Sequence, residues 1–155
     1  SMAASHAPGR GAKFLGSYQY QLDDKGRVSL PAAFRREAAD QSFVLIQAHP
    51  PALSLYPEGT WFGVEEQMRD LLKHQPEARM YVLSLMASAV EVVPDSQGRI
   101  LIPGRLKEAA QLDGQVMLVG LIDRVEIWNP TQFQQSAQAD TAAYAQFAGK
   151  IFGWR

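Results

Sequence analysis

The feature that most constrains this chain is a ten-residue stretch that occurs twice. Residues 22–31 read LDDKGRVSLP, and residues 94–103 read PDSQGRILIP, 72 positions later. In both copies an Asp stands four residues before an Arg, a Gly directly precedes the Arg, and a Pro follows it by four. A fold built on this chain must therefore use one local structure twice.

The similarity extends well beyond the motif at the same offset. Phe34 falls on Leu106, and Trp61 falls on Phe133, so size and polarity are kept over roughly forty positions without a gap. A shared offset of that length is typical of a tandem duplication. Each half, at roughly 70 residues, would be only marginally stable alone, so we expect the halves to complete one core.

Each copy predicts a β-hairpin that runs into a short helix. Residues 18–22 alternate large apolar and polar side chains, as a strand does when one face meets a core. Residues 24–26 are turn residues, because Asp bonds nearby backbone amides and Gly accepts a positive φ. Val28 and Leu30 continue the inward face, and Pro31 suits the first turn of a helix.

The repeated motif resembles the swapped-hairpin DNA-binding fold of AbrB-type transcription factors. Two copies of Asp-x-x-x-Arg in one short chain resemble the MraZ family, bacterial regulators usually encoded at the head of the division and cell-wall gene cluster. The resemblance runs from about Phe14 to about Phe133. It implies an α+β fold: a tandem-repeat, pseudo-dimeric, swapped-hairpin β-barrel with surrounding helices.

The domain organisation follows from the repeat and from the helical patterns between and after its copies. Apolar residues at three and four spacing follow Trp61, with Thr60 as the expected N-cap, and Asn129 is expected to cap a matching last helix. We expect a disordered N-terminal extension (1–12), a first AbrB-like repeat (13–61), a helical pair linking the repeats (62–88), a second AbrB-like repeat (89–133), and a C-terminal helix and tail (134–155).

Composition restricts the function more than it defines it. The 15 basic and 16 acidic residues give a net charge of -1, so any contact with DNA has to use a local basic patch. There is no cysteine, and no apolar run approaches the ~18 residues of a membrane span. We expect a cytoplasmic, nucleoid-associated protein without a membrane segment.

Catalytic and metal-binding patterns are missing from the sequence. His6, His49 and His74 have no ligand spacing, so we expect no metal and no cofactor. No nucleophile elbow, phosphate-binding loop or dinucleotide fingerprint occurs. The sequence therefore disfavours an enzyme.

The two motifs have a structural and a functional interpretation. The structural one is that Asp23 and Asp95 brace their turns while each Arg pairs with its Asp, and we favour it for the aspartates and for Gly98. Exposed ion pairs contribute only ~0–1 kcal/mol, which is weak reason to repeat an Arg. We therefore favour DNA contact for the two motif arginines and for residues near them, mainly in the first copy. The predicted contact residues are Lys25, Gly26, Arg27, Arg35, Arg36 and Arg99.

The resulting expectation is a sequence-specific transcriptional regulator. Resemblance to MraZ implies binding to direct repeats in double-stranded promoter DNA by a ring-shaped, octamer-like homo-oligomer. The first alternative is an antitoxin-type module of related fold whose main partner is a protein toxin; the short, partly apolar C-terminus makes a poor wrapping tail. The second is a scaffold ring that binds no DNA, which would leave the paired Gly-Arg turns unexplained.

Overall fold

Two antiparallel sheets carry the fold in the computed structural model, which describes residues 11, 13–38, 42–139 and 141–153. Most of the expected N-terminal extension (1–12) lies outside the described residues. The larger sheet has six strands, in the order β1 (Ser17–Gln21), β7 (Gln115–Leu121), β8 (Arg124–Trp128), β4 (Leu53–Pro57), β3 (Phe43–Ile46) and β5 (Val90–Val92). The smaller sheet is a ribbon of β2 (Arg27–Ser29) and β6 (Arg99–Leu101).

The strand pairings cross between the two repeats. β1 of the first repeat lies beside β7 of the second, and β5 of the second lies beside β3 of the first. The repeat equivalents are β1 and β5, β3 and β7, and β4 and β8. When each strand is exchanged for its equivalent, the six-stranded sheet has the same order read from the opposite edge. The local hairpin prediction was therefore wrong in its pairing. A turn links β1 to β2, but neither strand forms its ladder with the other.

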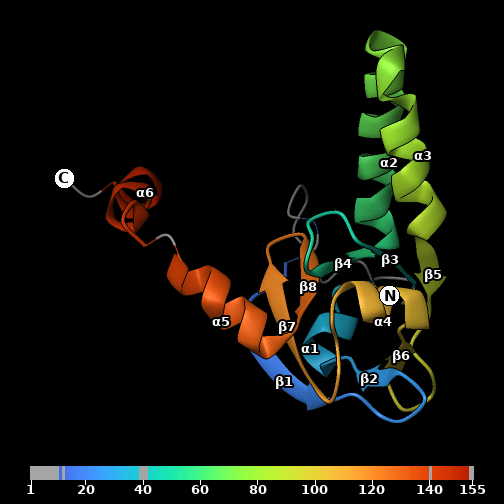
Figure 1. Cartoon of the computed structure of the whole chain (residues 1–155), viewed down its shortest axis with the longest axis vertical. Helices are drawn as coiled ribbons and strands as arrows, with labels where there is room; N and C mark the ends of the chain where they lie inside the picture. The colour runs from blue at the N-terminus through green and yellow to red at the C-terminus, as the bar shows by residue number, and fades with distance from the viewer. Residues whose placement is uncertain (1–10, 12, 39–41, 140, 154–155) are drawn as a thin grey trace.

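Helices surround the sheets, and the fold is α+β as predicted. They are α1 (Ala32–Arg35), α2 (Glu58–His74), a short 3-10 turn (Pro76–Ala78), α3 (Arg79–Ser88), α4 (Gly104–Ala109), α5 (Pro130–Ala139) and α6 (Tyr144–Phe152). Figure 1 shows α2 and α3 rising as a pair from one end of the molecule, while α5 and α6 extend from the other side. The strands of the described residues form an open sheet and a ribbon, so the predicted closed barrel is not found.

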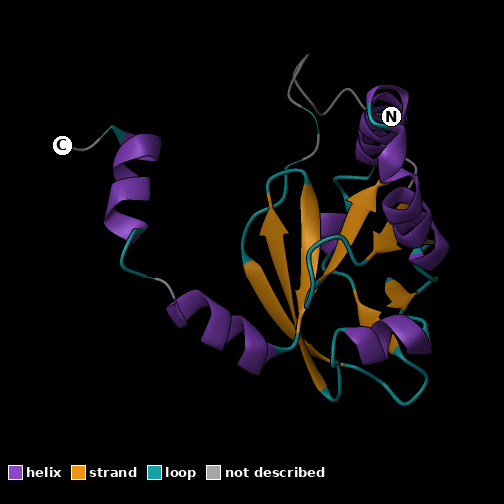
Figure 2. Ribbon diagram, turned by 45° about the horizontal axis from the view of Figure 1, so that its top comes forward, coloured by secondary structure: helices purple, strands orange, loops and turns teal. Residues whose placement is uncertain are grey.

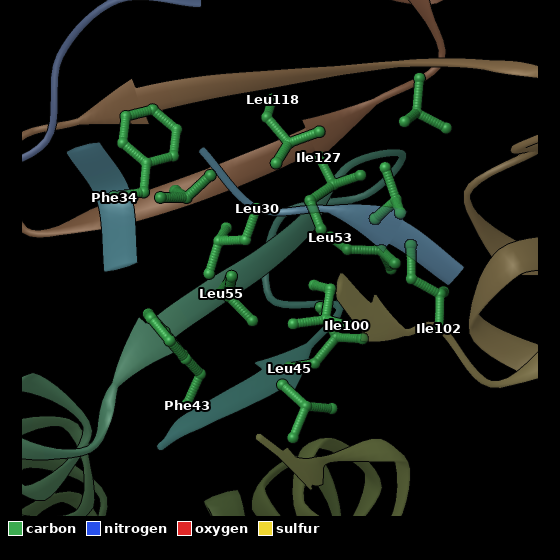
Figure 3. Packing of buried hydrophobic residues seen from close by; sticks show 14 of the residues in the cluster. Leu30, Phe34, Phe43, Leu45, Leu53, Leu55, Ile100, Ile102, Leu118 and Ile127 are labelled. Atoms are coloured by element: carbon green, nitrogen blue, oxygen red, sulfur yellow. The ribbon is translucent and has the colours of Figure 1, made fainter. Parts of the chain in front are cut away.

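Both repeats contribute to one hydrophobic core. Leu30 and Ile102, which are repeat equivalents, are 1% and 2% exposed, and the equivalents Phe34 and Leu106 are each 2% exposed. Figure 3 shows this core between the large sheet, the ribbon and α1, with Leu45, Leu53, Leu55, Ile100, Leu118 and Ile127 at its centre. Two marginal halves are stabilised because each buries its apolar face against the other.

One strand departs from the gap-free alignment of the repeats. The register places Tyr18 opposite Leu118, and places Val90, the equivalent of Tyr18, opposite Leu45. Leu45 is therefore structurally equivalent to Leu118, whereas the constant offset of 72 would match it to Met117. Because alternate strand residues face opposite sides, a one-residue shift is needed to keep both leucines in the core. Both are fully buried.

The two predicted caps have different outcomes. Asn129 Oδ1 accepts hydrogen bonds from the backbone N–H of Thr131 at 2.9 Å and of Gln132 at 3.1 Å, which confirms it as the cap of α5. The Thr60 prediction was wrong. α2 begins at Glu58 directly after β4, with Pro57 at the cap position, because Pro57 ends the strand and no loop intervenes. Among the described residues, no helix is long and apolar enough to cross a membrane.

Candidate nucleic-acid interface

The first turn (Asp23–Arg27) is held by the Asp23 carboxylate. Asp23 Oδ1 accepts from the backbone N–H of Lys25 at 2.9 Å and of Arg27 at 2.8 Å. Asp23 Oδ2 accepts from Arg27 Nε at 2.8 Å. Gly26 has a φ of +85°, a conformation that glycine adopts without strain. One carboxylate thus fixes both the backbone of the turn and the position of Arg27 Nε.

The second turn (Asp95–Arg99) repeats this geometry. Asp95 Oδ1 accepts from the backbone N–H of Gln97 and of Arg99, each at 2.9 Å, and Asp95 Oδ2 accepts from Arg99 Nε at 3.0 Å. Gly98 has a φ of +77°. The bracing role expected for the aspartates is therefore visible in the hydrogen bonds of both turns. The same bonds fix the direction of both arginines.

These contacts lower the pKa of both aspartates. For Asp23 the main cause is the hydrogen bond from the backbone N–H of Arg27, with smaller contributions from the Arg27 guanidinium and the N–H of Lys25. For Asp95 the backbone N–H of Arg99 is the main cause. Desolvation acts in the opposite direction on each pKa. Each carboxylate thus stays ionised to a lower pH than an ordinary aspartate and keeps its arginine oriented.

The β2–β6 ribbon brings the two arginines onto one face. Arg27 lies opposite Leu101, and Arg99 lies opposite Ser29, so these four side chains share the outer face of the ribbon. Their neighbours Val28 and Ile100 point to the core and are 1% and 0% exposed. Within the described part of the chain, Nε of each arginine bonds its own Asp, and no partner is found for the terminal Nη atoms.

The two turns also hold each other. The carbonyl oxygen of Gly98 accepts from the backbone N–H of Leu30 at 2.8 Å, and that of Gly26 accepts from Ile102 at 2.9 Å. Arg35 adds a third link, because its Nη1 donates to the Leu30 carbonyl at 2.8 Å while its guanidinium lies against Gly98. These bonds position the two arginine-bearing turns as one unit.

The remaining predicted site residues lie in two different settings. Lys25 is exposed at the tip of the first turn, and Arg36 is exposed at the end of α1. Gly26 and Gly98 are buried where the turns meet. Arg35 was predicted to contact DNA, but it is half-buried and hydrogen-bonded inside the protein. Arg35 thus links the two turns, and its contact with DNA stays a prediction, whereas Lys25 and Arg36 are accessible.

Ser29 and Leu101 also lie on the outer face, and neither was predicted from the sequence. Leu101 is 53% exposed, and Ser29 is half-buried opposite Arg99. Alternation along residues 27–30 could have placed Ser29 beside Arg27, but only the pairing of β2 with β6 brings in Leu101. Among the described residues, no group of three or more His, Asp or Glu side chains is placed to hold a metal ion.

Comparison with known proteins adds evidence of a different kind. A family model described as "MraZ protein, putative antitoxin-like" matches residues 13–83 and 85–148. A protein of Moorella thermoacetica named "Transcriptional regulator MraZ" is 37% identical over 138 residues, covering 89% of this chain and 96% of the relative. Relatives with the same name come from Desulfitobacterium hafniense, 41% identical over 138 residues with 89% and 96% coverage, and Azotobacter vinelandii, 39% over 144 residues with 90% and 95% coverage.

Proposed function

Because the chain belongs to the MraZ family, whose relatives above are named transcriptional regulators, we propose that it binds specific promoter DNA through the β2–β6 ribbon and its two turns. The protein is not an enzyme. The proposed reading surface is the outer face of the ribbon, with Arg27 and Arg99 as the base-contacting side chains. This is sequence-specific recognition by a two-stranded element rather than by a helix.

The single observation that carries this proposal is the matched orientation of Arg27 and Arg99. Each Nε–H is occupied by its own aspartate, and the terminal Nη atoms have no partner among the described residues. That end of a guanidinium is the fork that bonds guanine O6 and N7. Fixing the arginines before binding lowers the ordering cost of making those bonds.

The spacing of the two arginines suits base pairs that lie two steps apart. They are diagonal neighbours on an antiparallel ribbon, where such positions lie roughly 7–8 Å apart. Successive base pairs rise about 3.4 Å, so this separation spans about two steps. A major groove about 12 Å wide admits a two-stranded ribbon. The half-buried Ser29 hydroxyl and the exposed Leu101 side chain lie between the arginines, within reach of base edges and thymine methyl groups.

The two turns differ in charge, and we assign the main base contacts to the first. The first turn presents Lys25, where the second has Gln97. Arg36 is exposed at the end of α1, which follows β2 directly. We propose that Lys25 and Arg36 contact phosphates, which sets the orientation of the ribbon without reading sequence.

We further propose that the chain acts as a homo-oligomer on direct repeats upstream of the division and cell-wall gene cluster. One ribbon buries little surface, so useful affinity requires several ribbons that bind spaced repeats at once. A ring of copies, octamer-like, supplies that multivalency. The working location is then the cytoplasm, on the nucleoid. The toxin-binding alternative has no residue-level observation in its favour, and the relatives above are named as regulators.

An electrophoretic shift assay with DNA from upstream of the chain's own gene tests the proposal. We expect a discrete complex that survives a large excess of scrambled competitor DNA. Deleting repeats from the probe one at a time should weaken binding stepwise, because each repeat engages one more ribbon. Equal competition by scrambled and upstream DNA would contradict sequence-specific recognition.

A further inference from the structure

The last helix of the described residues, α6, exposes an apolar face. α6 carries Tyr144, Phe147 and Ile151 at three and four spacing, so these side chains share one face. They are 48%, 52% and 72% exposed, and Phe152 is 66% exposed. The Tyr144 hydroxyl donates to the Ala137 carbonyl of α5 at 2.7 Å, which ties the start of α6 to α5. An apolar face of this size on α6, the arm of the molecule, is typical of an interaction site.

A second apolar surface lies at the far side of the molecule. Phe62 on α2 is 60% exposed and lies at a groove of about 460 Å³ beside β3 and β5. The carboxylates of Glu58, Glu65 and Glu91 line this acidic groove together with Val44, Trp61 and Phe62. Figures 1 and 2 both show α6 and the α2–α3 pair projecting from opposite sides of the sheet. The α6 face and this acidic groove therefore do not meet within one chain.

The repeat provides an internal comparison for the acidic groove. A matching groove lies in the second repeat, lined by Gln19, Phe133 and Gln134 among others. Gln19 and Gln134 occupy the positions of Glu91 and Phe62, and Pro130 and Ala137 occupy those of Glu58 and Glu65. The fold thus forms the same groove without any carboxylate or exposed Phe. The acidic and aromatic character of the first groove is consequently not required by the fold.

The charges of the arm and the acidic groove are complementary. Residues 141–155 contain no Asp or Glu and include Lys150 and Arg155. Lys150 is exposed and lies next to Ile151 on α6. We propose that α6 of one copy of this chain docks, through Phe147 and Ile151, into the acidic groove of a second copy, with Lys150 facing its carboxylates. This inference rests on the proposed homo-oligomer and identifies the contact that builds it.

Such a contact has a geometric consequence. The α6 face and the acidic groove are different surfaces, so the interface is head-to-tail. A dimer held by one such contact still has one unused α6 face and one unused groove. Repetition of such a contact closes a ring when the rotation between copies divides a full circle. The ribbon face is not part of the contact, and its arginines remain available for DNA.

Disulfide trapping tests the contact directly, because the chain has no cysteine. A mixture of the full-length Phe62→Cys and Ile151→Cys variants should form a covalent dimer under mild oxidation, and neither variant alone should do so. Gln134→Cys is the matched control, since it places a thiol at the equivalent point of the uncharged groove. Equal trapping with Gln134→Cys, predominant trapping of Ile151→Cys with itself, or no trapping would overturn the proposal.

Charge exchange gives a second readout. Glu91→Lys should weaken self-association about two- to five-fold in sedimentation equilibrium, the range of one exposed ion pair. Adding Lys150→Glu to the same chain should restore it, whereas a further loss would contradict the docking. Ile151→Asp should give single copies with an unchanged circular dichroism spectrum, because Ile151 is exposed on the arm.

The DNA-binding proposal can fail independently of this one. Single copies of Ile151→Asp should still bind non-specific DNA at low salt, since both turns are untouched. Trapping of Phe62→Cys with Ile151→Cys, in a protein that binds no DNA, would support the docking contact and refute the DNA proposal. Specific DNA binding by a protein that shows no trapping would support the DNA proposal and refute the docking contact.

Discussion

The backbone N–H of Leu30 donates to the carbonyl oxygen of Gly98 across 2.8 Å, although the two residues belong to different repeats. The reciprocal bond runs from Ile102 to Gly26 at 2.9 Å. The residue before each motif proline thus holds the glycine of the other motif. This exchange makes the spacing of the two arginines a property of the fold and not of either turn alone.

The first prediction concerns the contact between Gly98 and Arg35. Gly98→Ala places a Cβ at a positive φ and against the Arg35 guanidinium, so we expect destabilisation by about 1–3 kcal/mol. Arg35→Ala removes that obstacle together with the bond to Leu30. In chemical denaturation, the double variant should cost less than the sum of the single variants.

The control for this prediction is Gly63→Ala. Gly63 lies within α2, and a Cβ there would meet nothing within 4 Å. Since glycine costs helices roughly 0.5–1 kcal/mol relative to alanine, this variant should be more stable than the parent. Strict additivity of Gly98→Ala and Arg35→Ala would show that the two residues do not act on each other.

The second prediction concerns the ionisation of Asp23 and Asp95. Both pKa values are lowered, so the two carboxylates add stability above the ordinary aspartate value of about 3.9, and that stability is lost as the pH falls through the lowered values. The main cause for Asp23 is the backbone N–H of Arg27. In a carboxyl-carbon NMR titration, the pKa of Asp23 in Arg27→Ala should therefore rise but stay below the ordinary aspartate value, because the backbone N–H bonds remain. An ordinary pKa in that variant would assign the effect to the guanidinium instead.

The third prediction separates phosphate contacts from base contacts. If Lys25 meets a phosphate, Lys25→Ala should weaken specific and non-specific DNA binding alike. The slope of log K against log salt should decrease in magnitude by ~0.9 for each phosphate that the variant no longer neutralises. Anisotropy titrations over a salt series give that slope. Gln97→Ala, the equivalent change in the second turn, is the matched control and should leave the slope unchanged.

Much of the fold follows from local sequence. β7 and β8 are examples, because alternation and β-branched residues are strong in both strands. The turn residues Asp24–Gly26 and the cap Asn129 were also predicted from local chemistry. Such features need only a few neighbouring residues, which is why they can be read from a single sequence.

The features that could not be predicted from the sequence depend on pairing between residues that are far apart in the chain. Nothing local to residues 17–29 indicates that β1 pairs with β7 and β2 with β6. The one-residue shift of Leu118 against Leu45 likewise depends on which face of the sheet is buried. The contact of Arg35 with Gly98 also joins the two repeats and could not be predicted from the sequence around Arg35, whose contact with DNA remains a prediction.

If Arg27 reads operator DNA, its removal should separate operator binding from folding. Fluorescence anisotropy is measured with operator and scrambled DNA for the parent and for Arg27→Ala, alongside a melting curve. A fork contact with guanine discriminates by roughly 1–3 kcal/mol at each site. An oligomer makes several such contacts, so specific binding should be almost abolished.

Binding to scrambled DNA should change little, because Lys25 and Arg36 supply the proposed phosphate contacts. The melting temperature should change little, because the backbone bonds of Asp23 still hold the turn. Arg99→Ala in the same assay compares the second turn and should cause a smaller loss of operator affinity. Direct reading of the operator by Arg27 requires that Arg27→Ala loses operator preference while it remains folded. Unchanged binding of the operator by folded Arg27→Ala would contradict it.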